Sequence, residues 1–226
     1  MSERRPRTEL SRLSLEPKQP LLTNGAASMI AQRLRREWYE RDALTLARAL
    51  IGCRLVDERD AARPLRVARI VETEAYRGPK DQASHSRVGI TPRTRVMFGE
   101  AGHAYVFFIY GMHDCFNITC FGPGKAHAVL VRAGEPMVGF DPHARLDGPG
   151  RFARAFGITR DDSGGDLTQG RLYLCPREKR PRIVASARVG VAYAEEWADR
   201  PWRFYDGASR HVSRPPKKAI GRGRPA

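Results

Sequence analysis

Residues 69–76 read RIVETEAY, and their alternation of side chains predicts a β-strand. Side chains of a β-strand alternate between two faces, so Glu72 and Glu74 share one face. Two acids on one face of an otherwise apolar strand have two explanations: the strand lies at a wet edge of a sheet, or the acids are placed for chemistry. The residues alone leave both open. Glu74, at the C-terminal end of the strand, is the better placed to face a pocket.

The sequence predicts further short strands and helices before and after this segment. We expect strands at 53–56, 65–75, 104–110, 115–121, 126–132, 172–175, 183–187 and 189–192, and a last packed segment at 204–205. We expect an amphipathic helix at 36–50 with Asp42 as a helix N-cap, a short helix at 148–157, and a turn or short helix at 195–202. Residues 77–99 hold too many Gly and Pro for a helix and form a long loop. With no linker between two apolar cores, the pattern predicts one mixed α+β domain.

The two ends of the chain differ in composition from the middle. Residues 1–30 are rich in Arg, Pro and Ser and show no sustained period, so we expect a mobile N-terminal extension. Residues 207–226 contain six Lys and Arg and no acid, which indicates a basic C-terminal tail. The folded domain is therefore expected at 31–206.

The chain is strongly basic, with 40 Lys and Arg against 25 Asp and Glu and a formal net charge of +15. The basic tail accounts for six of these charges, so the remainder still carries +9. Such a surplus suits a polyanionic partner, and it favours nucleic acid over acidic metabolites or anionic lipid. The alternative is a solvated basic surface in a protein of generally Arg-rich composition.

Membrane and metal signals are weak in this sequence. No stretch approaches the ~18–20 consecutive apolar residues of a membrane span, and the N-terminus lacks the apolar core of a signal peptide, so we expect a cytoplasmic or nucleoid-associated protein without a membrane partner. The cysteines form no CxxC pair and no Cys/His set at zinc spacing; they are Cys53, Cys115, Cys120 and Cys175. We expect buried, reduced thiols and neither a metal nor another cofactor.

An aromatic β-hairpin is predicted at 104–119, AYVFFIYGMHDCFNIT. Most of its aromatic side chains suit a core. Tyr110 is the exception, because it precedes Gly111 at the turn, where its own domain would bury it poorly. In a basic protein, such a side chain can act as a wedge between bases.

Three polar side chains point to the same end of the sheet as Glu74. Asn117 interrupts an apolar strand, so it either satisfies backbone groups or lines a pocket. Arg132 closes the apolar run 128–131. His85 stands in the Arg-containing loop, where an ordinary exposed histidine is the simpler explanation. Each signal alone is weak, and their convergence favours a site.

Together these motifs resemble the alkyladenine (3-methyladenine) DNA glycosylase family, the methylpurine glycosylases, in its bacterial form. The resemblance covers roughly residues 43–206, in order and with few gaps, and several of the motifs are rare outside that family. Besides RIVETEAY and the hairpin, it rests on GPKDQASHSR (78–87), TPRTRVMF (91–98), AVLVRAGEPMVG (128–139), DGPGRFARAFGIT (147–159), DLTQGRLYL (166–174) and VGVAYAEEWADRPWRFY (189–205).

The resemblance implies a curved antiparallel sheet with short helices around it, and a monomeric, monofunctional, metal-free enzyme. Its partner would be duplex DNA containing alkylated purines, which it would flip out and release by hydrolysing the N-glycosidic bond, leaving an abasic site. Glu74 would activate the water and Arg132 would position it. The base pocket would be formed by Tyr76, His85, Phe107 and Asn117.

The same resemblance assigns Tyr110 to the gap that the flipped nucleotide leaves in the duplex. Loop arginines would contact phosphates, and these are Arg87, Arg93 and Arg95. Phe107 departs from those relatives that have Tyr at this position, so stacking on a base is kept and a hydroxyl contact is lost.

Two other functions remain open from the sequence. One is a catalytically silent member that only binds damaged or bent DNA, although an intact pair of Glu74 and Arg132 argues against it. The other is an RNA-binding protein or a metal nuclease. A nuclease needs a cluster of acids, and Glu72 with Glu74 is too small a set.

Overall fold

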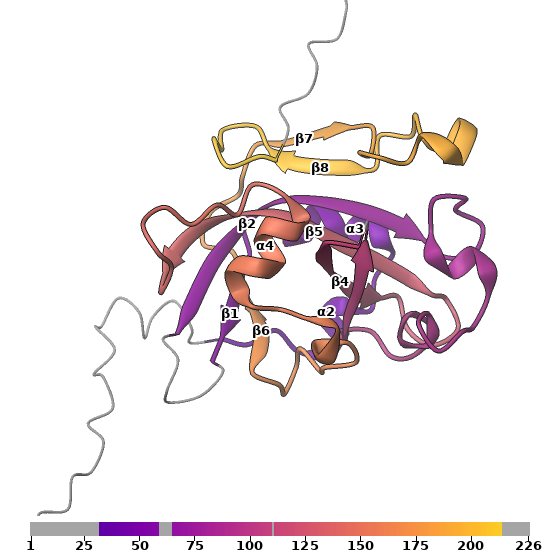
Figure 1. Cartoon of the computed structure of the whole chain (residues 1–226), viewed down its shortest axis with the longest axis horizontal. Helices are drawn as coiled ribbons and strands as arrows, with labels where there is room; N and C mark the ends of the chain where they lie inside the picture. Colours follow the sequence, from indigo (N-terminus) through magenta and orange to yellow (C-terminus); the bar gives the residue numbers. More distant parts are fainter. Residues whose placement is uncertain (1–31, 59–64, 110, 214–226) are drawn as a thin grey trace, which may run out of the picture.

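The computed structural model describes residues 32–58, 65–109 and 111–213, and within them β2 (Arg66–Arg77) is the central strand of an eight-stranded sheet (Figure 1). On one side β2 pairs with β5 (His127–Val138). On the other side it pairs first with β1 (Arg54–Asp57) and then with β8 (Arg203–Asp206). The two acids of RIVETEAY are fully buried. This excludes the wet-edge explanation for them.

The remaining described strands extend the same sheet, and every pairing among them is antiparallel. The order is β3 (Ala104–Ile109), β4 (His113–Cys120), β5, β2, β1 and β6 (Leu172–Cys175), while β7 (Ile183–Ser186) pairs with β8. The sheet curls around its core, and its helices are short (Figure 1). The predicted α+β domain with a curved antiparallel sheet is confirmed.

The ladder between β2 and β5 is irregular beside Glu72. Glu72 pairs with Ala133, but the register skips Val71 on β2 and Arg132 on β5. Such bulges bend a strand and redirect its side chains. Here the irregularity accompanies the contact of Arg132 with both acids of β2.

The helix expected at 36–50 is two helices, α2 (Arg36–Tyr39) and α3 (Ala43–Leu50). Asp42 separates them: its backbone is extended at ψ 147°, and its carboxylate accepts a hydrogen bond from the Leu44 N–H at 2.8 Å. A residue that caps one helix in this way cannot continue the preceding one. The single continuous helix was therefore wrong, whereas the N-cap at Asp42 is confirmed.

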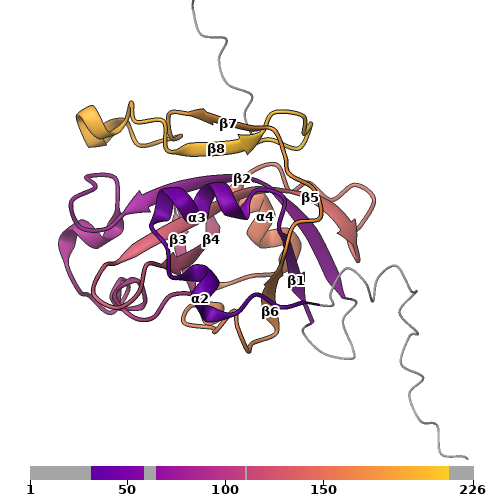
Figure 2. The same cartoon turned by 180° about the vertical axis from the view of Figure 1, so that it is seen from behind.

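α3 and α4 (Pro149–Phe156) lie on opposite sides of the central strands (Figures 1 and 2). The Thr73 hydroxyl donates to the Ala47 carbonyl at 2.9 Å, and Thr73 alternates with the two acids, so α3 covers the face away from them. α4 approaches β5 closely at Gly134, where a Cβ atom would come within 2.8 Å of the Phe152 ring.

The loop 77–99 contains two short 3-10 turns, η1 (His85–Val88) and η2 (Arg95–Phe98), in keeping with its many Gly and Pro. Two more turns follow, η3 (Arg160–Asp162) and η4 (Ala192–Trp197). The strand expected at 189–192 is wrong. Gly190 has a φ of +77°, outside the range of β-strands, and the segment turns into η4.

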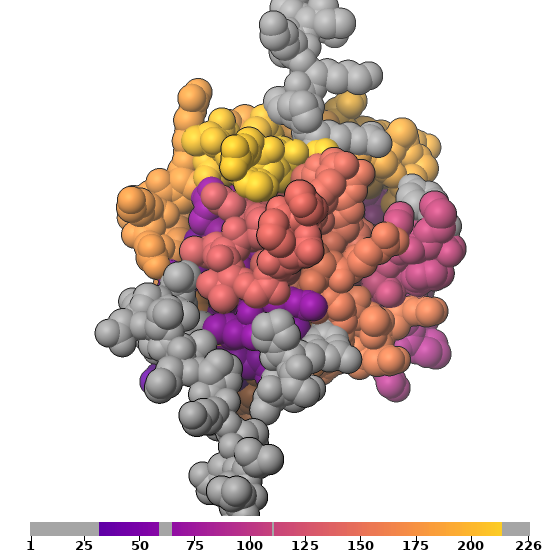
Figure 3. All heavy atoms as spheres, turned by 60° about the vertical axis from the view of Figure 1, so that its left-hand side comes forward, coloured from indigo at the N-terminus to yellow at the C-terminus, as the bar shows by residue number. Residues whose placement is uncertain are grey.

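β7 and β8 form the C-terminal part of the sheet, and the described chain continues past β8 to Ser213. In Figure 3 these last residues, in yellow, lie against the salmon-coloured region that includes β5. Hydrogen bonds from Ser213 to β2 and from β5 to Ser213 fix this arrangement. Within the described ranges, no helix has both the length and the apolar character needed to cross a membrane.

Candidate active site

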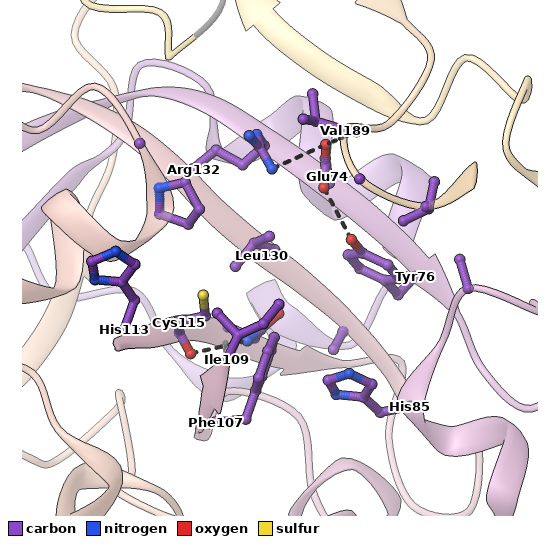
Figure 4. Close-up of a pocket in the computed structure, with 18 of the residues that line it drawn as sticks. Glu74, Tyr76, His85, Phe107, Ile109, His113, Cys115, Leu130, Arg132 and Val189 are labelled. Carbon is purple, nitrogen blue, oxygen red and sulfur yellow. Dashed lines mark hydrogen bonds and ion pairs between the residues drawn. The ribbon is translucent and has the colours of Figure 1, made fainter. Parts of the chain in front are cut away.

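A cavity of about 610 Å³ opens on the face of the sheet that carries the two acids (Figure 4). Its size falls in the ~300–1,000 Å³ range of small-molecule pockets. It lies between the ends of β2, β3, β4 and β5, the first turn of α4 and the segment before η4. Six residues singled out from the sequence line it, namely Glu74, Tyr76, His85, Phe107, Asn117 and Arg132. The fold thus brings them together, and their roles stay predictions.

The Glu74 carboxylate borders the cavity although the residue is fully buried. Its Oε1 accepts a hydrogen bond from the Val189 N–H at 2.7 Å and lies 3.3 Å from Nη1 of Arg132. Its Oε2 accepts from the Tyr76 hydroxyl at 3.0 Å. A carboxylate oxygen can accept more than one hydrogen bond, so Oε2 has the capacity to accept from a water as well.

Glu72, on the same face, holds Arg132. Its Oε1 accepts from Nε of Arg132 at 2.8 Å and from Nε of Arg203 at 2.7 Å. Ser213 adds two donors, its N–H to Oε2 at 2.6 Å and its hydroxyl to Oε1 at 2.9 Å. Two carboxylates and two guanidinium groups balance in charge, which is the condition under which buried ions are tolerated.

The cluster also sets the protonation states of its neighbours. Burial by itself would lower the pKa of Arg132, but the charges of Glu74 and Glu72 outweigh burial and raise it, so Arg132 is a cation. Burial, together with the Glu74 charge, raises the pKa of Tyr76 well above 10. Tyr76 is therefore a neutral phenol that can donate to Glu74.

Aromatic rings form two sides of the cavity. Tyr76 stands beside Glu74, and Phe107 with His85 stands across from it (Figure 4). The rings of His85 and Phe107 meet edge to face with centroids 4.4 Å apart. Nδ1 of His85 lies 2.9 Å from the Tyr105 hydroxyl. Burial is the main cause that lowers the pKa of His85 to about 4, so its ring is neutral at pH 7.

The Asn117 side chain is buried in the cavity wall on β4. Its Nδ2 donates to the carbonyls of Tyr105 at 3.1 Å and Cys115 at 3.3 Å. Both hydrogen bonds run to backbone atoms, so they fix the plane of the amide. The sequence left two explanations for this Asn, backbone satisfaction and pocket lining, and it does both.

The residues predicted to contact DNA do not line this cavity within the described part of the chain. The three loop arginines are exposed, and they are Arg87, Arg93 and Arg95. After burial, the charges of Arg93 and Arg87 also lower the pKa of His85, which itself lines the cavity. Tyr110 lies outside the described residues. Its neighbour Ile109 lines the cavity.

Sequence reasoning missed the segment that holds Val189 over Glu74. Arg188 and Asp81 form a fully buried pair with hydrogen bonds of 2.6 and 2.9 Å. The Arg188 guanidinium also lies 4.9 Å from the centre of the Tyr76 ring. Asp81 falls within the stretch 78–87 that carried the resemblance, whereas Arg188 lies one residue before the stretch 189–205. Neither residue has a local pattern that would reveal the pair.

The four cysteines are free and buried, as predicted. Across the part of the chain that the structure describes, no group of three or more His, Cys, Asp or Glu side chains could hold a metal ion.

Comparison with known proteins defines the class. The sequence profile of the methylpurine-DNA glycosylases matches residues 37–210. The chain therefore belongs to the methylpurine-DNA glycosylase family, DNA-repair hydrolases that act on N-glycosyl bonds. The resemblance seen in the sequence is confirmed.

Three relatives are similar to this chain over most of their length. A protein of Myxococcus xanthus (strain DK1622) is 49% identical over 191 residues, covering 84% of this chain and 96% of that protein. One from Methanocella arvoryzae is 46% identical over 193 residues, covering 80% and 96%. One from Anaeromyxobacter sp. (strain Fw109-5) is 49% identical over 189 residues, covering 81% and 94%. All three are provisionally named 3-methyladenine DNA glycosylases.

Proposed function

We propose that this protein removes alkylated purines of the 3-methyladenine type from duplex DNA by flipping the damaged nucleotide into the cavity and hydrolysing its N-glycosidic bond. The observation that carries the proposal is the Glu74 carboxylate, buried yet bordering an aromatic cavity and held by Arg132 and the Val189 N–H. The names of the relatives support the substrate class.

Flipping is required because the reactive bond of a stacked purine is out of reach in a duplex. A damaged base pairs and stacks poorly, so its extrusion costs less than the few kcal/mol of a normal base. Alkylation at a ring nitrogen gives the purine a positive charge, which the electron-rich faces of Tyr76 and Phe107 favour. A neutral His85 adds no opposing charge. The fixed Asn117 amide would exclude the exocyclic amine of guanine.

The chemistry consists of one bond broken and one formed. As the bond from C1′ to the purine nitrogen lengthens, its electron pair leaves with the base and neutralises the base's charge. The sugar becomes oxocarbenium-like, and the Glu74 carboxylate stabilises it. A water oxygen then bonds to C1′ and gives its proton to Glu74 at Oε2. Arg132 keeps that carboxylate in place, and the products are a free base and an abasic site in an intact strand.

Tyr110 and the loop arginines complete the proposal on the DNA side. Tyr110 would occupy the gap in the duplex from the hairpin tip, next to Ile109 at the edge of the cavity. The exposed loop residues Arg87, Arg93 and Arg95 would contact phosphates and hold the backbone beside the cavity.

Base release from alkylated duplex DNA tests the proposal. With EDTA present, we expect free 3-methyladenine and abasic sites that become strand breaks only after alkali. In Glu74→Gln the single-turnover rate of release is expected to fall by at least about 100-fold, because a general base contributes ~10²–10⁴. Glutamine keeps the shape of the side chain and an oxygen that can accept from the Val189 N–H.

Binding to duplex DNA with a tetrahydrofuran abasic site controls for folding, and Glu74→Gln should bind within about threefold of wild type. Glu196→Gln alters an exposed acid outside the cavity and is the matched control for loss of a charge. Wild-type release by the Glu74→Gln variant would remove Glu74 from its role. Tight binding without release by the wild-type protein would instead favour a silent DNA binder.

A further inference from the structure

The chain past β8 returns to the cavity at Ser213. This residue lines the cavity and contacts the buried cluster of Glu72 and Arg132. It follows Asp206, the last residue of β8, by seven residues. The Gly207 N–H donates to the Arg182 carbonyl at 2.8 Å beside the β7–β8 pairing, and the Ser209 N–H donates to the Asp206 carbonyl at 3.0 Å in a turn. The C-terminal segment is thus part of the described fold.

Ser213 makes three hydrogen bonds in the cluster. Its N–H donates to Glu72 Oε2 at 2.6 Å, and its hydroxyl donates to Glu72 Oε1 at 2.9 Å. The same hydroxyl oxygen accepts from Nη2 of Arg132 at 3.3 Å. A hydroxyl can donate one hydrogen bond while it accepts another. Among uncharged aliphatic side chains only Ser and Thr offer this.

Glu72 needs these donors because it is a fully buried carboxylate. The two guanidinium Nε atoms that bind it both reach Oε1, and the Ser213 N–H serves Oε2. A buried acceptor that loses a donor costs ~1–3 kcal/mol, more when it is charged. Without Ser213, this cost would favour a rotation of the Glu72 side chain towards another donor. Arg132 is bound to Glu72 through Nε and faces Glu74 through Nη1, so it would follow that rotation.

We propose that Ser213 is a positioning residue for base excision, holding Glu72 and, through it, the Arg132 guanidinium that faces Glu74. Ser213 acts on the reaction through these two residues. The inference rests on the proposed glycosylase function. It makes residues 207–213, which follow β8, a requirement for the rate of the chemical step.

A set of variants at position 213 of the full chain tests this. Ser213→Ala removes the hydroxyl and keeps the N–H, Ser213→Pro removes both donors, and Ser213→Thr restores the hydroxyl. We expect the single-turnover excision rate to fall about tenfold in the Ala variant and about 100-fold in the Pro variant, with Thr within about threefold of wild type. Ser209→Ala, in the same segment, is the matched control and should excise at the wild-type rate.

The second measurement is affinity for duplex DNA with a tetrahydrofuran abasic site, which all variants should retain within about twofold. Retained affinity with a lowered rate, restored by Thr, supports positioning. Wild-type rates in both the Ala and Pro variants would overturn it, as would affinity and rate falling together or Thr failing like Ala. Failure of the proposed function shows in the wild-type protein itself, which would then release no base, whereas failure of this inference shows only in the variants.

Discussion

Two carboxylates stand two residues apart on β2, and their partners give them different surroundings. Glu74 borders the cavity and receives the Val189 N–H and the Tyr76 hydroxyl. Glu72 lies among Arg132, Arg203 and Ser213. The same residue type on the same strand face can therefore serve two purposes, because the neighbours that surround each carboxylate differ.

A prediction at this scale concerns His85, whose pKa is lowered from 6.5 to about 4, chiefly by burial. As the pH falls from 6.5 towards 4, the unfolded state binds the proton before the folded state does, so the free energy of unfolding decreases. Urea unfolding at pH 7 and pH 4.5 should show wild type losing on the order of 2 kcal/mol more than His85→Gln. Identical pH dependence of the two proteins would contradict the neutral ring.

At the scale of elements, the cavity depends on two loops that are far apart in the chain. The buried pair of Arg188 and Asp81 joins the loop after β2 to the segment after β7. Asp81 also accepts from the backbone N–H groups of Arg77 and Ala83. This ion pair therefore holds two segments in place. One is the start of the loop that carries His85, and the other is the backbone at Val189, whose N–H donates to Glu74.

The second prediction concerns this pair. Arg188→Met leaves Asp81 as an uncompensated buried charge and should lower the free energy of unfolding by about 3–5 kcal/mol. The double variant Arg188→Met/Asp81→Asn should lose clearly less, because the charge is gone. Urea unfolding measures both.

The control for that experiment is Arg145→Met, whose pair with Asp147 has an arginine side chain 64% exposed, and it should keep a midpoint near wild type. A double variant no more stable than Arg188→Met would show that Arg188 acts through packing on Tyr76 rather than through Asp81.

Several elements could be predicted because their signals are local. The alternation in RIVETEAY and in the hairpin predicted β2, β3 and β4, and the residue type of Asp42, directly before α3, predicted its N-cap. The break before Asp42 was missed because apolar spacing continued across it. Asp81 and Arg188 are 107 positions apart, and Ser213 and Glu72 are 141 apart. Such pairs depend on how the strands assemble, which no local pattern records.

At the scale of the whole molecule, charge is divided between surface and interior. The chain carries a net +15, whereas the cluster under the cavity pairs two acids with two arginines. Under the proposed function, a cationic base entering the cavity would meet a locally balanced site, while the surplus of positive charge would remain for the phosphate backbone.

The third prediction follows from this division. Raising salt from 50 to 200 mM should weaken DNA binding steeply, and Arg93→Gln should reduce the slope of log K against log salt by about 0.9, the value for one phosphate contact. The single-turnover excision rate at saturating protein should stay within about twofold. Arg180→Gln, an exposed arginine outside the cavity lining, is the control and should leave the slope unchanged. An unchanged slope in Arg93→Gln would remove that residue from the phosphate contacts.

The place of the two acids on β2 has a consequence for how the protein responds to heat. β2 is paired on both sides, and strands of this kind are among the last parts of a domain to open, whereas loops and edge strands open first. Glu72 and Glu74 therefore keep their positions on the strand for as long as the sheet itself persists. On warming, the segments that supply Val189 and Ser213 would separate from the two acids before β2 leaves the sheet, and on cooling they would return to a strand that is already in place.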